Sequence, residues 1–167
     1  WNGIVWSQIE VPEELQETRW RAMDGQAGVI WLLGDSGLWR LDDLGWSQLD
    51  VGADVDKIRD LWSIDLLSLW LVGDGGLLRR ISGAGVEVMD NPGPDLLAIH
   101  GAHQDEIWAV GRQGRTLRWH DGLWFEYLPV TRSDLHAVHA VDGARVWAAG
   151  DSGALLSWDG ISWSALG

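Results

Sequence analysis

Five histidines are the residues of this sequence best suited to bind a metal or to exchange a proton near neutral pH. All five lie between positions 100 and 139, and two of them form the pair His136-x-x-His139. In a β-strand, however, residues three apart point to opposite faces, so this pair does not converge on one ion. We therefore expect no metal site. The histidines are expected instead to form hydrogen bonds, and His100, His136 and His139 are candidates to line a polar pocket.

The tetrapeptide Gly-Asp-Ser-Gly, at 34–37 and again at 150–153, matches the sequence around the nucleophile of trypsin-like serine proteases. Such a serine also needs a base and an orienting acid. Here the tetrapeptide stands at one position of a repeat, where Gly75 or Gln113 replaces the serine in the other copies. It is therefore predicted to be a hairpin turn.

The acidic residues show no catalytic or ion-binding pattern. Asp54-x-Asp56, with Asp60 nearby, lacks the glycine and terminal glutamate of a calcium loop. No pair of carboxylates stands out as a glycosidase pair. The glycine-rich segment 73–76 joins two predicted strands and precedes no helix, which a phosphate-binding loop would require. We predict that the protein is not an enzyme and needs no cofactor.

The composition excludes several classes of partner. The 167 residues include 14 Trp and 22 Gly, carry a net charge of −13 and contain no Cys. Such an acidic chain is unsuited to nucleic acid or to an anionic membrane, because both attract clustered positive charge. No apolar run approaches the ~20 residues of a membrane span. No signal peptide is visible, but the chain starts at Trp1 without Met, so a processed N-terminus is one expectation.

A repeat runs through the chain. The pattern W-x-x-G-x-x-G begins at Trp31, Trp70, Trp108 and Trp147, at spacings of 39, 38 and 39 residues. A period of this length is typical of a solenoid or a propeller. We divide the chain, as one domain, into an outer strand at 1–9 and four repeats at about 10–49, 50–89, 90–128 and 129–167.

Each repeat consists of four short runs rich in Trp, Val, Ile and Leu, separated by turns that contain Gly and Asp. These runs are too short for helices and suit a pleated, half-buried surface. Four antiparallel strands per repeat define the blade of a β-propeller. The predicted fold is therefore an all-β propeller of about four blades.

The two ends of the chain carry the same strand sequence. Residues 1–9 copy residues 158–166, which gives five outer strands for four blades. The N-terminal strand either completes the last blade of a closed four-blade ring, or it pairs with a neighbouring blade of a larger ring. In the second case the chain is half of a ring, and self-association through the outer strands is expected.

Most tryptophans have a structural explanation, because they recur at repeat positions. Trp31, Trp70, Trp108 and Trp147 are predicted to pack blade against blade. Trp62 breaks the pattern, since it stands near the predicted axis where other repeats have polar residues. The candidate ligand-binding residues around it are Arg59, Asp60, Trp62, His100, His136 and His139.

The segments 105–124 and 146–163 resemble the bacterial Trp- and Gly-rich propeller repeat D-x-W-A-V-G-x-x-G … W-D-G-x-x-W. They are similar, more distantly, to tectonin-type repeats of propeller lectins. The resemblance covers essentially the whole chain and is strongest over 95–167. Residues 82–88 depart from it, which leaves the outer hairpin of repeat two open. The resemblance implies a non-catalytic binding scaffold that is secreted or on the cell surface.

Two functions remain open. The first is a scaffold that binds a protein partner, and the negative charge favours a basic one. The second is a carbohydrate-binding, lectin-like propeller with one site per blade. Such a lectin should keep the same ligand residues in each blade, whereas the turn position holds Asp35, Asp74, Arg112 and Asp151. This divergence favours the scaffold.

Overall fold

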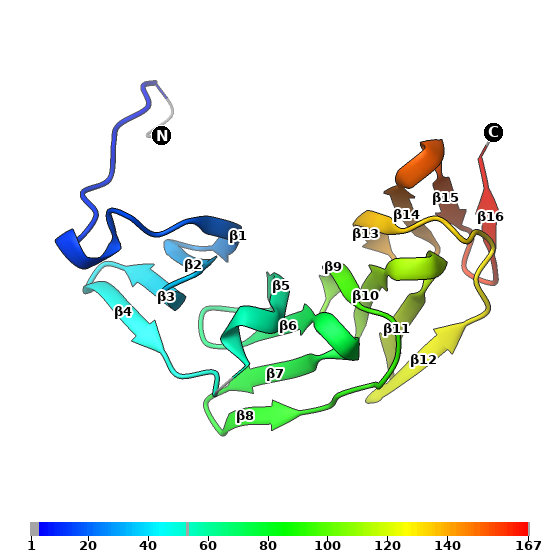
Figure 1. The fold of residues 1–167 in the computed structure, drawn as a ribbon, viewed down its shortest axis with the longest axis horizontal. Coiled ribbons are helices and arrows are strands. Elements are labelled where there is room, and N and C mark those ends of the chain that lie inside the picture. The colour runs from blue at the N-terminus through cyan, green and yellow to red at the C-terminus, as the bar shows by residue number, and fades with distance from the viewer. Residues whose placement is uncertain (1–3, 53, 167) are drawn as a thin grey trace.

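The computed structural model describes residues 4–52 and 54–166, which form four four-stranded antiparallel sheets. In each sheet the strands lie in chain order (Figure 1). Blade 1 contains β1 (Trp20–Gln26), β2 (Val29–Gly34), β3 (Gly37–Asp42) and β4 (Gly45–Leu49). Blade 2 contains β5 (Ile58–Ser63), β6 (Leu69–Gly73), β7 (Leu78–Ser82) and β8 (Gly85–Val88). Blade 3 contains β9 (Leu96–His103), β10 (Glu106–Gly111), β11 (Thr116–His120) and β12 (Leu123–Tyr127). Blade 4 contains β13 (Leu135–Asp142), β14 (Arg145–Gly150), β15 (Leu155–Trp158) and β16 (Trp163–Ala165).

The only helices among the described residues are five 3-10 turns of three residues each. None of the helices in 4–52 and 54–166 has the length and apolar character that a membrane crossing requires. Two turns lie in connectors, and three form the hairpin after the second strand of blades 2, 3 and 4. They are Glu13–Leu15, Val55–Lys57, Asp74–Gly76, Arg112–Gly114 and Asp151–Gly153.

The Gly-Asp-Ser-Gly segment is a hairpin turn, as predicted. In blade 4 its Ser152 has a φ of 56°, and the equivalent Gln113 of blade 3 has a φ of 60°. This left-handed conformation suits glycine best, and Gly75 occupies the same position in blade 2 with a φ of 66°. The repeat sequence therefore encodes a tight reversal between the second and third strands.

The four blades fan out around one axis as an open arc (Figure 1). The innermost strands meet in succession, because β1 contacts β5, β5 contacts β9 and β9 contacts β13. Blades 1 and 4 lie at opposite ends of the arc, with the open side between them. Of the two arrangements that the sequence left open, residues 4–52 and 54–166 adopt the open arc and do not close a four-blade ring.

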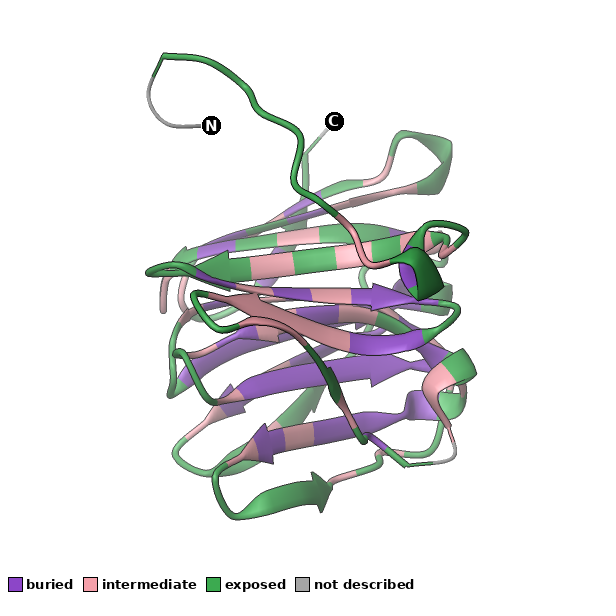
Figure 2. Cartoon of the chain, turned by 90° about the vertical axis from the view of Figure 1, so that its left-hand side faces the viewer, coloured by how far each residue is buried: buried purple, intermediate pink, exposed green. Residues whose placement is uncertain are grey.

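The hydrophobic core lies between the blades. One cluster joins blades 1 and 2, a second joins blades 2 and 3, and a third joins blades 3 and 4. The repeat tryptophan of each of the first three blades enters the cluster shared with the following blade. In Figure 2 the buried residues run along the strands, whereas the N-terminal segment is exposed.

Two sequence predictions concern the ends of the arc. The first is the outer strand at 1–9. Residues 1–3 lie outside the described residues, and 4–9 form no strand. A strand needs a neighbour for its backbone hydrogen bonds, and the third strand of every described blade already pairs with its own fourth strand.

The second prediction, that Trp147 packs between blades, is wrong. Its side chain is 39% exposed, because the face of blade 4 on which it lies has no following blade. The sequence also left open whether repeat two forms its outer hairpin. Its outer hairpin forms, as strands β7 and β8, although the tryptophan signature is missing there.

Candidate functional site

Two neighbouring cavities lie along the innermost strands, and Asp24 and Trp62 line both. The larger, of about 470 Å³, is at the C-terminal ends of β1, β5 and β9. The smaller, of about 270 Å³, lies over the middle of β1, β5, β9 and β13. We call this region the inner-strand site and define it by Asp24, Asp60, Trp62, His100, His136 and His139.

A side chain on the innermost strand ties each of two blades to the next. Asp24 Oδ2 accepts hydrogen bonds from the backbone N–H and the hydroxyl of Ser63, both at 2.6 Å. Between blades 3 and 4, His100 Nδ1 accepts the N–H of Ala140 at 3.2 Å. Asp24 and His100 occupy equivalent positions, since each lies opposite the repeat tryptophan of its own blade. Both side chains therefore satisfy a backbone donor of the following blade.

Trp62 occupies this position in blade 2, where its ring packs on the following blade and another residue accepts the hydrogen bond. Its ring lies against Gly101, where an added Cβ would come within 2.5 Å of the ring. The acceptor for blade 3 is supplied two residues earlier, because Asp60 Oδ2 accepts the N–H of Ile99 at 2.9 Å. The ring centroid of Trp62 is also 6.3 Å from that of His100. The exceptional tryptophan is thus matched by a glycine in the next blade.

Burial shifts the pKa values of two side chains in this site, Asp60 and His100. It raises the pKa of Asp60 to about 6, against the opposing effect of the hydrogen bond from Ile99. Burial also lowers the pKa of His100, and the neighbouring His139, whose ring centroid is 4.5 Å away, lowers it further. His100 is therefore neutral at pH 7, as a hydrogen-bond acceptor must be.

The structure brings five of the six predicted residues together. Asp60, Trp62, His100 and His136 line the smaller cavity, and His139 joins them through its contact with His100. Arg59 lies apart from both cavities.

The two predicted residues at the start of their strands have partners in their own blades. Arg59 pairs with both carboxylate oxygens of Asp74. The Nε2 atom of His136 lies 2.9 Å from Oδ1 of Asp151. Both partners are the first residue of the turn between the second and third strands. In residues 4–52 and 54–166, no group of three or more His, Cys, Asp or Glu side chains is placed to hold a metal ion.

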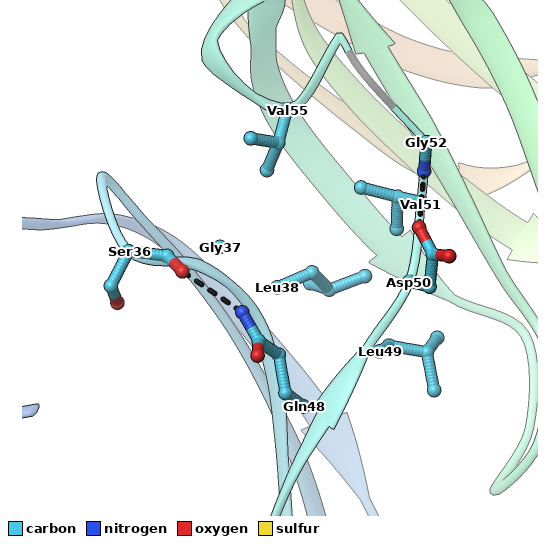
Figure 3. A pocket seen from close by; sticks show the side chains of 9 residues that line it. All are labelled: Ser36, Gly37, Leu38, Gln48, Leu49, Asp50, Val51, Gly52 and Val55. Atoms are coloured by element: carbon cyan, nitrogen blue, oxygen red, sulfur yellow. Dashed lines mark hydrogen bonds between the residues drawn. The ribbon is translucent and has the colours of Figure 1, made fainter. Parts of the chain in front are cut away.

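Sequence reasoning did not include Asp24 in the site, although its repeat position is that of His100. It also missed a separate cavity of about 300 Å³ beside the connector between blades 1 and 2. Figure 3 shows its apolar wall, which includes Leu38 and Val51, and the hydrogen bond from Gln48 Nε2 to the carbonyl oxygen of Ser36 at 3.0 Å. The cavity forms where the connector residues Val51 and Val55 meet strands β3 and β4, and that contact does not follow from the repeat pattern.

Solved structures with the same arrangement of blades are propellers. The structure of YCF48 bound to D1 peptide is similar over 98% of this chain and 57% of that chain, with a TM-score of 0.71 and 17% identity. YCF48 from Cyanidioschyzon merolae matches over 84% of this chain and 50% of that chain, with a TM-score of 0.68 and 16% identity. An extracellular domain of the putative hybrid two-component system BT3049 from B. thetaiotaomicron matches over 89% of this chain and 24% of that chain, with a TM-score of 0.62 and 11% identity.

These similarities show the fold, which is that of β-propeller blades. The chain spans 57% and 50% of the two YCF48 chains. No protein-family model and no curated protein sequence matches the chain.

Proposed function

We propose that this chain is a non-catalytic binding scaffold whose inner-strand site takes a basic segment of a protein partner. The observation that carries the proposal is the larger cavity. Its lining contains the carboxylates of Asp24 and Asp65 beside the indole of Trp62, and it contains no Lys or Arg. An arginine or lysine side chain fits such a site, because carboxylates attract its charge and an aromatic face accepts a cation.

The charge of the whole chain supports the same kind of partner. A net charge of −13 on 167 residues attracts cationic surfaces and repels anionic ones at long range. At the mouth of the cavity, Asp65 is exposed, and its Oδ1 accepts only a local hydrogen bond from the N–H of Leu67. The carboxylate has a second oxygen that is available to a partner.

The similarity to a peptide-bound propeller is consistent with this proposal. The solved YCF48 structure contains a D1 peptide. A propeller face offers a partner the ends of several strands at once, which suits an extended segment. For this chain, the strands that meet at the larger cavity are β1, β5 and β9.

The test is fluorescence anisotropy with two labelled 12-residue peptides, one rich in Arg and Lys and one with Glu in their place. We expect only the basic peptide to bind, with an affinity that falls as salt is added. Asp65→Asn should weaken binding about 3-fold to 10-fold, as the loss of one charge-assisted hydrogen bond predicts. Asp43→Asn, in the exposed outer turn of blade 1, changes the charge equally and should have no effect. Equal binding of both peptides, or equal effects of both variants, would contradict the proposal.

Carbohydrate binding, the alternative from the sequence, also depends on Trp62. The equivalent positions in the other blades hold Asp24, His100 and His139, so the aromatic platform is not repeated from blade to blade. A glycan array distinguishes the two functions. Sugar binding without binding of the basic peptide would replace the proposed function by the lectin-like one.

A further inference from the structure

A further cavity, of about 330 Å³, lies between blades 1 and 2 beside strands β3, β7 and β8. We call it the Trp31 cavity and define it by Trp31, Arg40, Leu67, Ile81 and Val86. Trp31 and Ile81 also belong to the hydrophobic cluster that joins these two blades. The cavity is therefore continuous with the core of the blade 1–2 interface.

In the other two interfaces, the repeat tryptophan contacts two tryptophans of the following blade. The ring centroid of Trp70 lies 4.9 Å from that of Trp119 and 5.2 Å from that of Trp124. These two partners pair with each other across the third and fourth strands of blade 3. The contacts of Trp108 with blade 4 have the same distances and the same register. A tryptophan pair thus fills this place in two interfaces.

Blade 2 carries smaller side chains at the two equivalent positions. Ile81 pairs with Val86 across β7 and β8, in the register of the tryptophan pair of blade 3. The turn between them contains Gly83 and Gly85, at which an added Cβ would meet no atom within 4 Å. The Trp31 cavity therefore lies where the other interfaces hold two indoles, and its mouth is open.

The remaining components of the interface are the same in all three cases. The guanidinium carbon of Arg40 lies 5.7 Å from the ring centroid of Trp31. The equivalent arginines of blades 2 and 3 lie over their own repeat tryptophans at 5.8 and 5.4 Å. The interface between blades 1 and 2 thus keeps the tryptophan and the arginine, and it differs in the aromatic pair of the following blade.

Apolar side chains are exposed at the mouth of the Trp31 cavity. Val86 is 41% exposed, and Leu67, in the connection between β5 and β6, is 64% exposed. Exposed apolar side chains that gather at one cavity mark an interaction site, whereas single ones scattered over a surface do not.

The polar side chains that line the cavity already have partners in the chain. Arg40 forms an ion pair with Asp42 at 2.6 Å. Asp50 and Ser82 each accept a hydrogen bond from a nearby backbone N–H. A free small molecule needs polar groups that fix its orientation. The cavity offers mainly an apolar shape, which suits a ring that a protein chain holds in place.

We propose that the Trp31 cavity binds an aromatic side chain of a protein partner, at the place that a tryptophan pair fills in the other two interfaces. Its volume is at the lower end of the range of about 300–1,000 Å³ for ligand sites, so it suits one ring system. Burial of the ring against Trp31 and the apolar wall supplies the driving force. The cavity shares no lining residue with the inner-strand site, so it is a second site.

The test is a titration of the wild-type chain with N-acetyltryptophan amide, a capped tryptophan residue, followed by NMR of isotope-labelled Ile, Leu and Val methyl groups. We expect saturable shifts at Leu67, Ile81 and Val86, and none at Leu123 on blade 3. N-acetylleucine amide should give no saturable shift at the same concentrations, because it carries no ring. Free indole should bind no more tightly than the capped residue.

A variant that supplies the missing indole from within the chain provides the matching evidence. Val86→Trp should abolish the shifts at Leu67 and Ile81 and should raise the thermal unfolding temperature, since it fills the cavity. Leu123→Trp adds the same group at a position of blade 3 that is 61% exposed, and it should leave binding unchanged. The wild-type methyl shifts need no variant, so they decide the result even if Val86→Trp does not fold.

Four outcomes would overturn the proposal: no saturable shift, shifts confined to residues outside the cavity, equal binding of the leucine probe, or unchanged binding to a folded Val86→Trp variant. Tighter binding of free indole would assign the cavity to a free aromatic molecule in place of a protein side chain. Val86→Trp should leave binding of the basic peptide unchanged, and Asp65→Asn should leave the tryptophan probe unaffected. Either proposed site can therefore fail without the other.

Discussion

The middle and the end of the arc contain the same tryptophan in two different environments. Trp70 and Trp108 are fully buried, whereas Trp147 is exposed at the equivalent position. All three lie on the second strand of their blades in the same W-x-x-G context. The difference arises from the following blade. Trp70 and Trp108 each contact a pair of aromatic residues in the blade that follows, whereas no blade follows that of Trp147 among the described residues. In a repeat protein, the burial of a residue is thus decided by its neighbouring repeat as well as by its own.

A second difference separates the same regions. Arg40, Arg80 and Arg118 each lie over the repeat tryptophan of their own blade, at 5.4–5.8 Å from the ring centroid. Blade 4 has Ser157 opposite Trp147. The last tryptophan therefore lacks both the following blade and the cation that covers its equivalents.

The largest effect is expected at the centre of the arc. Trp70→Ala should lower the free energy of unfolding by about 3–5 kcal/mol, because it removes a fully buried indole and leaves a cavity. Urea denaturation measures the change. Trp147→Ala is the matched variant, and at a concentration where the chain is monomeric its loss should be clearly smaller. Equal losses would show that the two positions are equally buried.

The buried ion pair of blade 3 is the next target. Glu106 is buried, and it accepts hydrogen bonds from Trp108 at 2.7 Å and from two nitrogens of Arg118 at 2.7 and 2.8 Å. Glu106→Gln should cost about 3 kcal/mol, since it leaves the Arg118 guanidinium without its counter-charge. The pair Arg145–Asp142 of blade 4 is exposed, so Asp142→Asn should leave the urea midpoint unchanged. A Glu106→Gln variant as stable as the wild type would contradict the expected difference between the buried and the exposed ion pair.

A pH-dependent effect is expected at Asp60 on the inner surface. Its pKa is about 6 in the folded chain against an ordinary value of 3.8, so folding favours the protonated form. The contribution of Asp60 to stability is therefore present below pH 3.8 and is lost as the pH rises through 6. Asp60→Asn stays neutral, so its advantage over the wild type should grow by about 1–3 kcal/mol from pH 4 to pH 7. Urea titrations at both pH values measure this difference, and a constant difference would contradict the raised pKa.

The smallest effect on stability is expected from adding to blade 4 the arginine that covers the repeat tryptophan in the other blades. Ser157→Arg would place a guanidinium over Trp147, as in the three other blades, and should stabilise the chain by about 0.5–1 kcal/mol. Ser157→Glu is the matched control and should give no gain. Thermal unfolding in dilute solution measures both variants. An equal gain from both would mean that side-chain size, and not the cation, is responsible.

The fold was predictable because its information is local and repeated four times. The spacing of Trp31, Trp70, Trp108 and Trp147 defines the repeat, and the Gly- and Asp-containing turns define its strands. Even repeat two, which lacks the outer tryptophan signature, forms its β7–β8 hairpin. In that blade, the two strands pair in register from Arg79 opposite Val88 to Ser82 opposite Gly85.

The candidate site was predictable only in part. Trp62, His100 and His139 could be placed near the axis because they occupy one repeat position. The partners of Arg59 and of Asp24 could not be predicted. Arg59 turns to Asp74 in its own blade, while Asp24 reaches Ser63 in the next. Which side chains meet depends on how the blades are rotated against each other, and no residue pattern within a single repeat records that rotation.

The sequence by itself therefore determined the strands, the turns and the number of blades, because each follows from residue types at short range. Only the tertiary structure decided that the four blades form an open arc, that residues 4–9 form no strand and that Trp147 is exposed. These features depend on which surfaces find a neighbour in space. The sequence of residues 1–9 repeats that of an outer strand, but a strand forms only where another strand is free to pair with it.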